Sequence, residues 1–104
     1  MPLPDLDPEQ RRQALAKAAE VRQIRAQVKQ MLKSGEVTFG EVLARAETAE
    51  PLAKMRVSEL LEALPNIGKV RARRVMEDLD IAPTRRLRGL GPRQKDALRQ
   101  AFGG

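Results

Sequence analysis

The sequence predicts an all-α protein in which a long N-terminal helix precedes a small bundle of shorter helices. Apolar residues recur at helical spacing, helix-start signals precede most of these segments, and no stretch alternates apolar with polar residues as a half-buried strand would. A chain of 104 residues can bury a modest core without disulfides, so we expect residues 1–104 to form one domain.

The first predicted helix spans residues 8–33. Asp7, Pro8 and Gln10 form a strong start signal, and Ser34-Gly35 ends the pattern. The second half carries an apolar stripe that we expect to dock on the core: Val21, Ile24, Val28, Met31 and Leu32. The first half is rich in alanine, with Leu15 as its only large apolar residue, so it either projects, frays or becomes ordered against a partner.

Four basic residues of this helix are predicted to lie opposite the apolar stripe: Arg22, Arg25, Lys29 and Lys33. Two interpretations stay open. They form either an ordinary exposed face or a second surface for a polyanion, and the sequence favours neither.

Shorter helices follow. Thr38 and Glu41 form a capping box for a helix that reaches about Glu47, and Pro51 is expected to end the connection after it. A third helix is predicted from about Val57 to Leu64.

The segment Leu64-Pro65-Asn66-Ile67-Gly68 predicts a tight hairpin before a fourth helix that runs to about Asp78. Pro65 restricts the residue before it, and asparagine tolerates a left-handed turn. Gly68 permits close approach to the unpaired N–H groups of a helix start, which favour anions. Four cations surround this start: Lys69, Arg71, Arg73 and Arg74. We expect Val70 to pack on the first helix rather than to touch a ligand.

Residues 82–92 contain two prolines and two glycines and therefore predict an ordered loop, anchored by Leu87 and Leu90. The loop carries a second basic group: Arg85, Arg86 and Arg88, followed by Gly89. Pro92 starts a fifth helix with Leu98 and Phe102 facing inward.

Charge and composition narrow the function. The 20 Lys and Arg residues exceed the 14 Asp and Glu residues, and the regional net charge is +3 over residues 1–34, −3 over 35–64 and +6 over 65–104, which indicates a polyanionic partner. The absence of Cys and His argues against zinc, haem and His-dependent catalysis, so we expect no cofactor and no metal. No signal peptide or apolar run long enough for a membrane span is evident, which predicts a cytoplasmic, nucleoid-associated protein without a membrane partner.

Two segments carry a family resemblance: Leu64-Pro65-Asn66-Ile67-Gly68-Lys69-Val70-Arg71-Ala72 and Thr84-Arg85-Arg86-Leu87-Arg88-Gly89-Leu90-Gly91. With Lys54-Met55 and the capped first helix, they resemble the integration host factor of actinobacteria over nearly the whole chain. More distantly, residues 57–104 are similar to the helix-two-turns-helix module of ribosomal protein S13 and of formamidopyrimidine-DNA glycosylases.

This resemblance implies a nucleoid-associated protein that binds duplex DNA with little sequence preference, bends or compacts it, and supports phage integration. The open helix start and the arginines of both segments predict contacts to phosphates and to the minor groove. We further expect a monomer without enzymatic activity. The binding residues carried over from the family are Asn66, Ile67, Gly68, Lys69, Arg71 and Arg73 near the hairpin, and Arg85, Arg86 and Arg88 in the loop. We add Arg74 and Gly89 to the predicted DNA-binding site because they lie beside these residues in the sequence. The general motif has glycine where this chain has Asn66.

Two other function classes are compatible with parts of the sequence. An RNA-binding or ribosome-associated protein is the main alternative, although only Phe39 and Phe102 could stack on bases and both are expected to be buried. A glycosylase would use the amine of Pro2 as its nucleophile. Such an enzyme also needs a large β domain and a metal-supported finger, for which this chain has no room, so we expect neither catalysis nor a small-molecule substrate.

Overall fold

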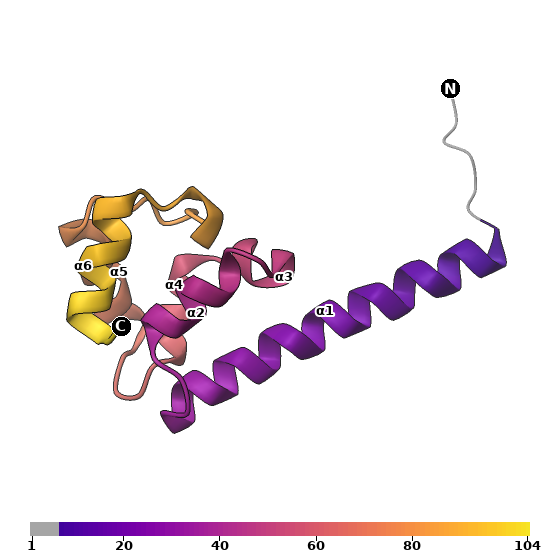
Figure 1. Cartoon of the computed structure of the whole chain (residues 1–104), viewed down its shortest axis with the longest axis horizontal. Helices are drawn as coiled ribbons and strands as arrows, with labels where there is room; N and C mark the ends of the chain where they lie inside the picture. The colour runs from indigo at the N-terminus through magenta and orange to yellow at the C-terminus, as the bar shows by residue number, and fades with distance from the viewer. Residues whose placement is uncertain (1–6) are drawn as a thin grey trace.

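The computed structural model describes residues 7–104, and their helices follow the predicted order (Figure 1). They form α1 (Pro8–Ser34), α2 (Phe39–Ala46), α3 (Glu50–Ala53), α4 (Val57–Ala63), α5 (Lys69–Asp78), a short 3₁₀ helix η1 (Leu87–Gly89) and α6 (Pro92–Phe102). Between residues 7 and 104 there is no β-strand, and the all-α prediction is confirmed. Pro2, the nucleophile in the glycosylase hypothesis, lies outside the described residues.

Helix α1 begins and ends as its flanking residues predict. The Asp7 carboxylate accepts a hydrogen bond from the Gln10 backbone N–H at 2.7 Å, and the Gln10 side-chain oxygen accepts one from the Asp7 N–H at 3.2 Å. Gly35 ends the helix with φ 82°. Residues 7–20 are all exposed, and the N-terminal half of α1 extends away from the other helices (Figure 1). Of the three predicted possibilities, the structure therefore shows projection.

The core lies between α2, α4, α5 and α6, with the second half of α1 along one side. Val28 and Leu32 of α1 are buried, while Val21, Ile24 and Met31 of the predicted stripe are partly buried. The Phe39 ring of α2 meets the Phe102 ring of α6 at a centroid distance of 6.2 Å. This packing leaves the α4–α5 turn and the loop before α6 at the surface.

The sequence prediction missed α3. Pro51 was expected to end a connection, but it lies in the first turn of this four-residue helix. A proline fits there because N–H groups of the first turn have no partner inside the helix. Leu52 and Ala53 are buried, so burial of the apolar side holds a helix that is too short to form alone.

Candidate nucleic-acid interface

The α4–α5 hairpin has the predicted backbone. Asn66 adopts φ 64°, in the left-handed region, and the chain reverses there. Leu64 is extended with ψ 148° before Pro65, and the Ile67 N–H donates to the Leu64 carbonyl at 3.3 Å. Asn66 therefore serves in place of the motif's glycine, and Ile67 packs partly against the core.

The start of α5 is open to a ligand. Gly68 occupies the cap position, no side chain from residues 7–104 caps the helix, and the first helical bond runs from the Ala72 N–H to the Gly68 carbonyl at 3.0 Å. Gly68 has φ −92°, which any residue adopts, and a methyl group added to it would meet no atom within 4 Å. The fold itself therefore does not require glycine at position 68. A glycine does, however, let an anion approach the first-turn N–H groups closely, because it has no Cβ.

Four exposed cations fan around this helix start: Lys69, Arg71, Arg73 and Arg74. Within the described part of the chain none of them forms an ion pair. Lys69 and Arg73 line a hollow on one side of α5, while Arg71 and Arg74 line another. Their charges are therefore available to an external anion on both sides of the helix start.

Val70 lies in this same first turn and corrects a prediction. It was expected to pack on α1, but its side chain is 80% exposed. The reason is its position on α5: Ala72 and Met76 face the core, and Val70 points out beside Gly68 and Arg71. An apolar side chain is thus presented to whatever approaches the helix start.

Helix α1 contributes to the same region. Lys29 and Lys33 line a cleft of about 730 Å³ together with residues 64–68 of the hairpin. Glu59 and Glu62 of α4 line it as well, so the cleft carries both signs of charge. The tertiary structure therefore brings two basic residues of α1 beside the predicted hairpin, which lies about thirty residues further along the sequence.

Arg25 does not share the free basic face that was predicted for it. Its guanidinium Nε–H donates to the Pro51 carbonyl at 3.3 Å, and the side chain is partly buried. Arg22 remains exposed. At 100° per residue Arg25 lies close to Leu32, at the edge of the buried stripe, which explains why it faces α3.

The loop between α5 and α6 is ordered, as predicted, by buried Leu87 and Leu90. Backbone hydrogen bonds also tie it to the segment before α4, from the Val57 N–H to the Arg85 carbonyl and from the Leu87 N–H to the Met55 carbonyl, each at 3.0 Å. These bonds hold the loop's arginines in place relative to α3 and α4.

Arg85 and Gly89 contact each other within the loop. The Arg85 Nη1 donates to the Gly89 carbonyl at 2.6 Å, and a Cβ at Gly89 would lie 2.8 Å from the Arg85 Cδ. Glycine at position 89 thus makes room for the arginine. This contact gives both residues a structural role in the loop. Their contacts with DNA stay a prediction.

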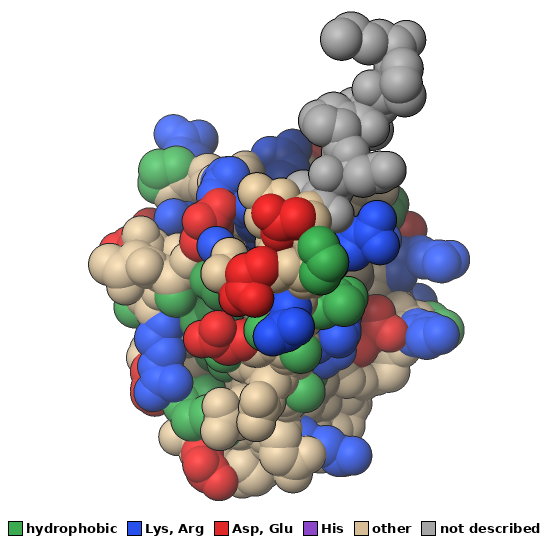
Figure 2. Space-filling view, turned by 90° about the vertical axis from the view of Figure 1, so that its right-hand side faces the viewer, with side chains coloured by type: hydrophobic (Ala, Val, Ile, Leu, Met, Phe, Trp, Pro, Cys, Tyr) green, Lys and Arg blue, Asp and Glu red, His purple; other side chains and the backbone are tan. Residues whose placement is uncertain are grey.

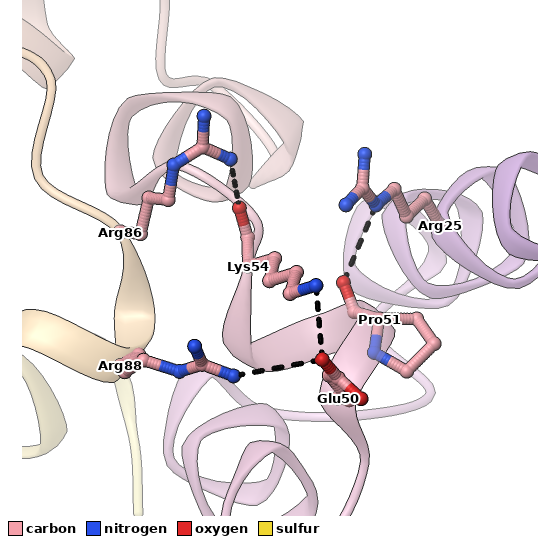
Figure 3. Close-up of polar contacts among 6 residues, drawn as sticks. All are labelled: Arg25, Glu50, Pro51, Lys54, Arg86 and Arg88. Carbon is pink, nitrogen blue, oxygen red and sulfur yellow. Dashed lines mark hydrogen bonds and ion pairs between the residues drawn. The ribbon is translucent and has the colours of Figure 1, made fainter. Parts of the chain in front are cut away.

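Helix α3 is surrounded by cations from three elements (Figure 3). Arg86 Nη1 donates to the Lys54 carbonyl at 2.5 Å, and the Lys54 Nζ lies 2.9 Å from Glu50 Oε1. Arg88 reaches the same carboxylate oxygen at 3.9 Å. The hydrogen bond and charge of Lys54, aided by Arg88 and Lys17, hold the pKa of the Glu50 carboxyl below its ordinary value.

We call the group formed by Arg25, Glu50, Lys54, Arg86 and Arg88 the α3 cluster. Four cations and one carboxylate leave it strongly positive. Lys54 was not among the predicted site residues, because nothing in its local sequence shows that the loop of residues 82–92 folds beside it. The only local signal is the spacing of Glu50 and Lys54, which fits an ion pair across one helical turn.

Comparison with known proteins assigns the family. Residues 32–102 match the model of the S13-like H2TH domain. The integration host factor of Mycolicibacterium smegmatis is 57% identical over 102 residues, which cover 98% of this chain and 97% of that protein. The integration host factor of Mycobacterium tuberculosis is 56% identical, with 99% and 98% covered. The chain belongs to the actinobacterial integration host factor family.

The chain is also 48% identical to the integration host factor of Streptomyces coelicolor, over 99% of this chain and 96% of that protein. A solved structure of sIHF bound to an 8-bp palindromic DNA superposes with a TM-score of 0.82 at 45% identity, covering 85% of this chain and 99% of that one. The family and the presence of an S13-like module are confirmed, whereas the predicted bounds of that module, residues 57–104, stay a prediction. The matched domain begins at Leu32, so most of α1 lies outside it.

Positive charge is not concentrated at the end of the molecule where α1 projects. Figure 2 looks at the molecule from that end and shows Lys and Arg side chains interspersed with Asp and Glu. Residues 7–104 contain no group of acidic side chains arranged to hold a metal ion, and none of their helices is long and apolar enough to cross a membrane.

Proposed function

We propose that this chain is a nucleoid-associated architectural protein that binds duplex DNA mainly through phosphates and with little sequence preference. The observation that carries the proposal is the start of α5, where Gly68 leaves uncapped N–H groups open and four exposed cations surround them. A helix start of this kind binds a phosphate through both its dipole and its donors. The DNA-bound relative at 45% identity supports duplex DNA as the polyanion.

A second contact is supported by the α3 cluster. In Figure 1 the α4–α5 turn and the loop before α6 lie on opposite sides of the group of helices. We propose that one duplex held at both places curves around the protein, or that two duplexes are held together. Either arrangement bends or compacts DNA, and it supports our proposal of an architectural role in the chromosome and in phage integration. Arginines of the loop are the candidates for entry into a narrow minor groove.

Duplex DNA is favoured over single-stranded RNA by the lack of a stacking surface. The sequence contains two aromatic residues. Phe39 is fully buried, whereas Phe102, which was also expected to be buried, is only partly buried because it lies at the end of α6, packed against Phe39. Recognition of unpaired bases relies on exposed aromatic side chains, whereas phosphate contacts need only cations and N–H donors.

The first test is a salt titration of binding to a short mixed-sequence duplex, followed by fluorescence anisotropy. With about five phosphates neutralised, the logarithm of the association constant should fall with the logarithm of salt concentration with a slope of about −4 to −5. A slope shallower than about −2 would contradict phosphate-dominated binding. Competition by duplex DNA should exceed competition by structured RNA, and the reverse order would favour the ribosomal alternative.

The second test is Gly68→Ala. Because a methyl group there meets nothing within 4 Å, the variant should fold with stability within about 1 kcal/mol of the parent and yet bind DNA several-fold more weakly, since the methyl stands between phosphate and backbone. Gly91→Ala is the matched control. Gly91 also caps a helix with an ordinary φ, −78°, and its added methyl meets no atom nearer than 3.8 Å. Equal affinities for the two variants would argue against a phosphate at the start of α5.

A further inference from the structure

Glu50 is the acidic residue within the α3 cluster, and its position is set by tertiary contacts. Arg86 binds the carbonyl of Lys54 and Arg25 binds the carbonyl of Pro51, so two carbonyls of α3 and the residue that follows it are tied to other elements (Figure 3). This fixes the helix whose first residue is Glu50. The carboxylate therefore reaches cations that are distant in sequence because α3 is held between α1 and the loop.

One oxygen of Glu50 is shared by two cations. Oε1 lies 2.9 Å from Lys54 Nζ and 3.9 Å from Arg88 Nη2. The side chains are well exposed, by 66% for Glu50, 48% for Lys54 and 61% for Arg88. Ion pairs this exposed contribute little to stability and exchange readily. The carboxylate thus occupies an accessible oxyanion position between two cations.

We propose that the Glu50 carboxylate mimics a DNA phosphate. In the free protein it holds the side chains of Lys54 and Arg88 close together, and a phosphate of the duplex displaces it when DNA binds. Glu50 is then a restraint on affinity rather than a contact. This inference rests on the proposed function, because it assumes that the α3 cluster receives a phosphate. It extends that function by naming Lys54 and Arg88 as the two cations that bind this phosphate.

Glu50 lowers the affinity for DNA because its carboxylate and the DNA phosphate carry like charges and compete for the same two cations. A carboxylate left about 4 Å from a bound phosphate opposes it by about fivefold in affinity even in water. The lowered pKa of Glu50 agrees with a carboxylate that stays charged in this setting. Removing the charge without changing the shape should therefore tighten binding and let one further phosphate be neutralised.

The experiment compares Glu50→Gln with Glu36→Gln in the full chain, using duplex binding across a salt series. Both changes remove one negative charge from an exposed side chain, and Glu36 forms no ion pair within residues 7–104. Glu50→Gln should raise affinity about fivefold and steepen the salt slope by about 0.9, while Glu36→Gln should change affinity less than about twofold. In a Lys54→Gln, Arg88→Gln background the effect of Glu50→Gln should fall to that of the control.

The outcomes separate the two proposals. If the unaltered chain fails to bind duplex DNA, the proposed function itself is wrong. If it binds but Glu50→Gln behaves like Glu36→Gln, or weakens binding, the inference is overturned while the proposed function stands. A gain that persists in the Lys54→Gln, Arg88→Gln background also overturns it, because the carboxylate would then act through the general field.

Discussion

Replacing Lys69, Arg71 and Arg73 together by glutamine is expected to lower affinity for duplex DNA about 100-fold at 0.15 M salt. Each phosphate contact contributes about 0.9 to the salt slope, which is about fivefold in affinity at this salt concentration. Three lost contacts multiply to the stated value, and the slope should become shallower by about 3. The three side chains are exposed and form no ion pair in the described structure, so the melting temperature should change little.

The control for this triple variant loses the same charge elsewhere. Arg12, Arg45 and Arg99 lie on α1, α2 and α6, and their replacement by glutamine reduces net charge equally. We expect less than about a tenfold loss from the control, because it affects only the general field of the protein. A loss that is uniform across DNA sequences in the first variant supports phosphate recognition. Equal losses in both triple variants would show that overall charge, not the start of α5, governs binding.

Leu87→Ala is expected to have the largest effect on the arginine loop. Leu87 is 2% exposed, so its truncation should cost about 2–5 kcal/mol and lower the melting temperature by about 10–30 °C. Loss of the anchor also frees Arg86 and Arg88, and ordering two such side chains on DNA again should weaken binding about tenfold. The measurements are thermal unfolding and duplex binding at a temperature where the variant remains folded.

Leu98→Ala is the control that distinguishes a general loss of core packing from a loss of loop positioning. Leu98 is fully buried in α6, and its truncation should cost a similar free energy of unfolding. Because Leu98 belongs to α6 and not to the arginine loop, DNA affinity should stay near that of the parent at the same temperature. If both alanine variants bound DNA equally well, the loop would not need its anchor, and the second contact proposed at the α3 cluster would lose its support.

Local signals predicted the helices and the hairpin well. The two capping boxes at Asp7 and Thr38 define helix starts that the structure repeats. Asn66 takes the left-handed conformation expected of it. Such features depend on residues within a few positions of one another, so the sequence contains them in full. The family followed from the hairpin and loop segments for the same reason.

The errors concern residues whose role depends on distant neighbours. Helix α3 is short and exists because Leu52 and Ala53 are buried beneath other elements. Val70 was expected to pack on α1, yet no helix of the described residues covers its side chain. Arg25 was assigned to a free face, but the carbonyl of Pro51 lies within its reach. Periodicity alone says which side of a helix is apolar, not which element lies against it.

By itself, the sequence determined the helical class, the hairpin at Asn66, the cations at the start of α5 and the family, because each rests on neighbouring residues. Only the tertiary structure decided that Lys29 and Lys33 line one cleft with the hairpin, and that Lys54, Arg86 and Arg88 gather around α3 with Glu50 in their midst. The physical reason is that convergence of charges from separate elements depends on how the core packs those elements together.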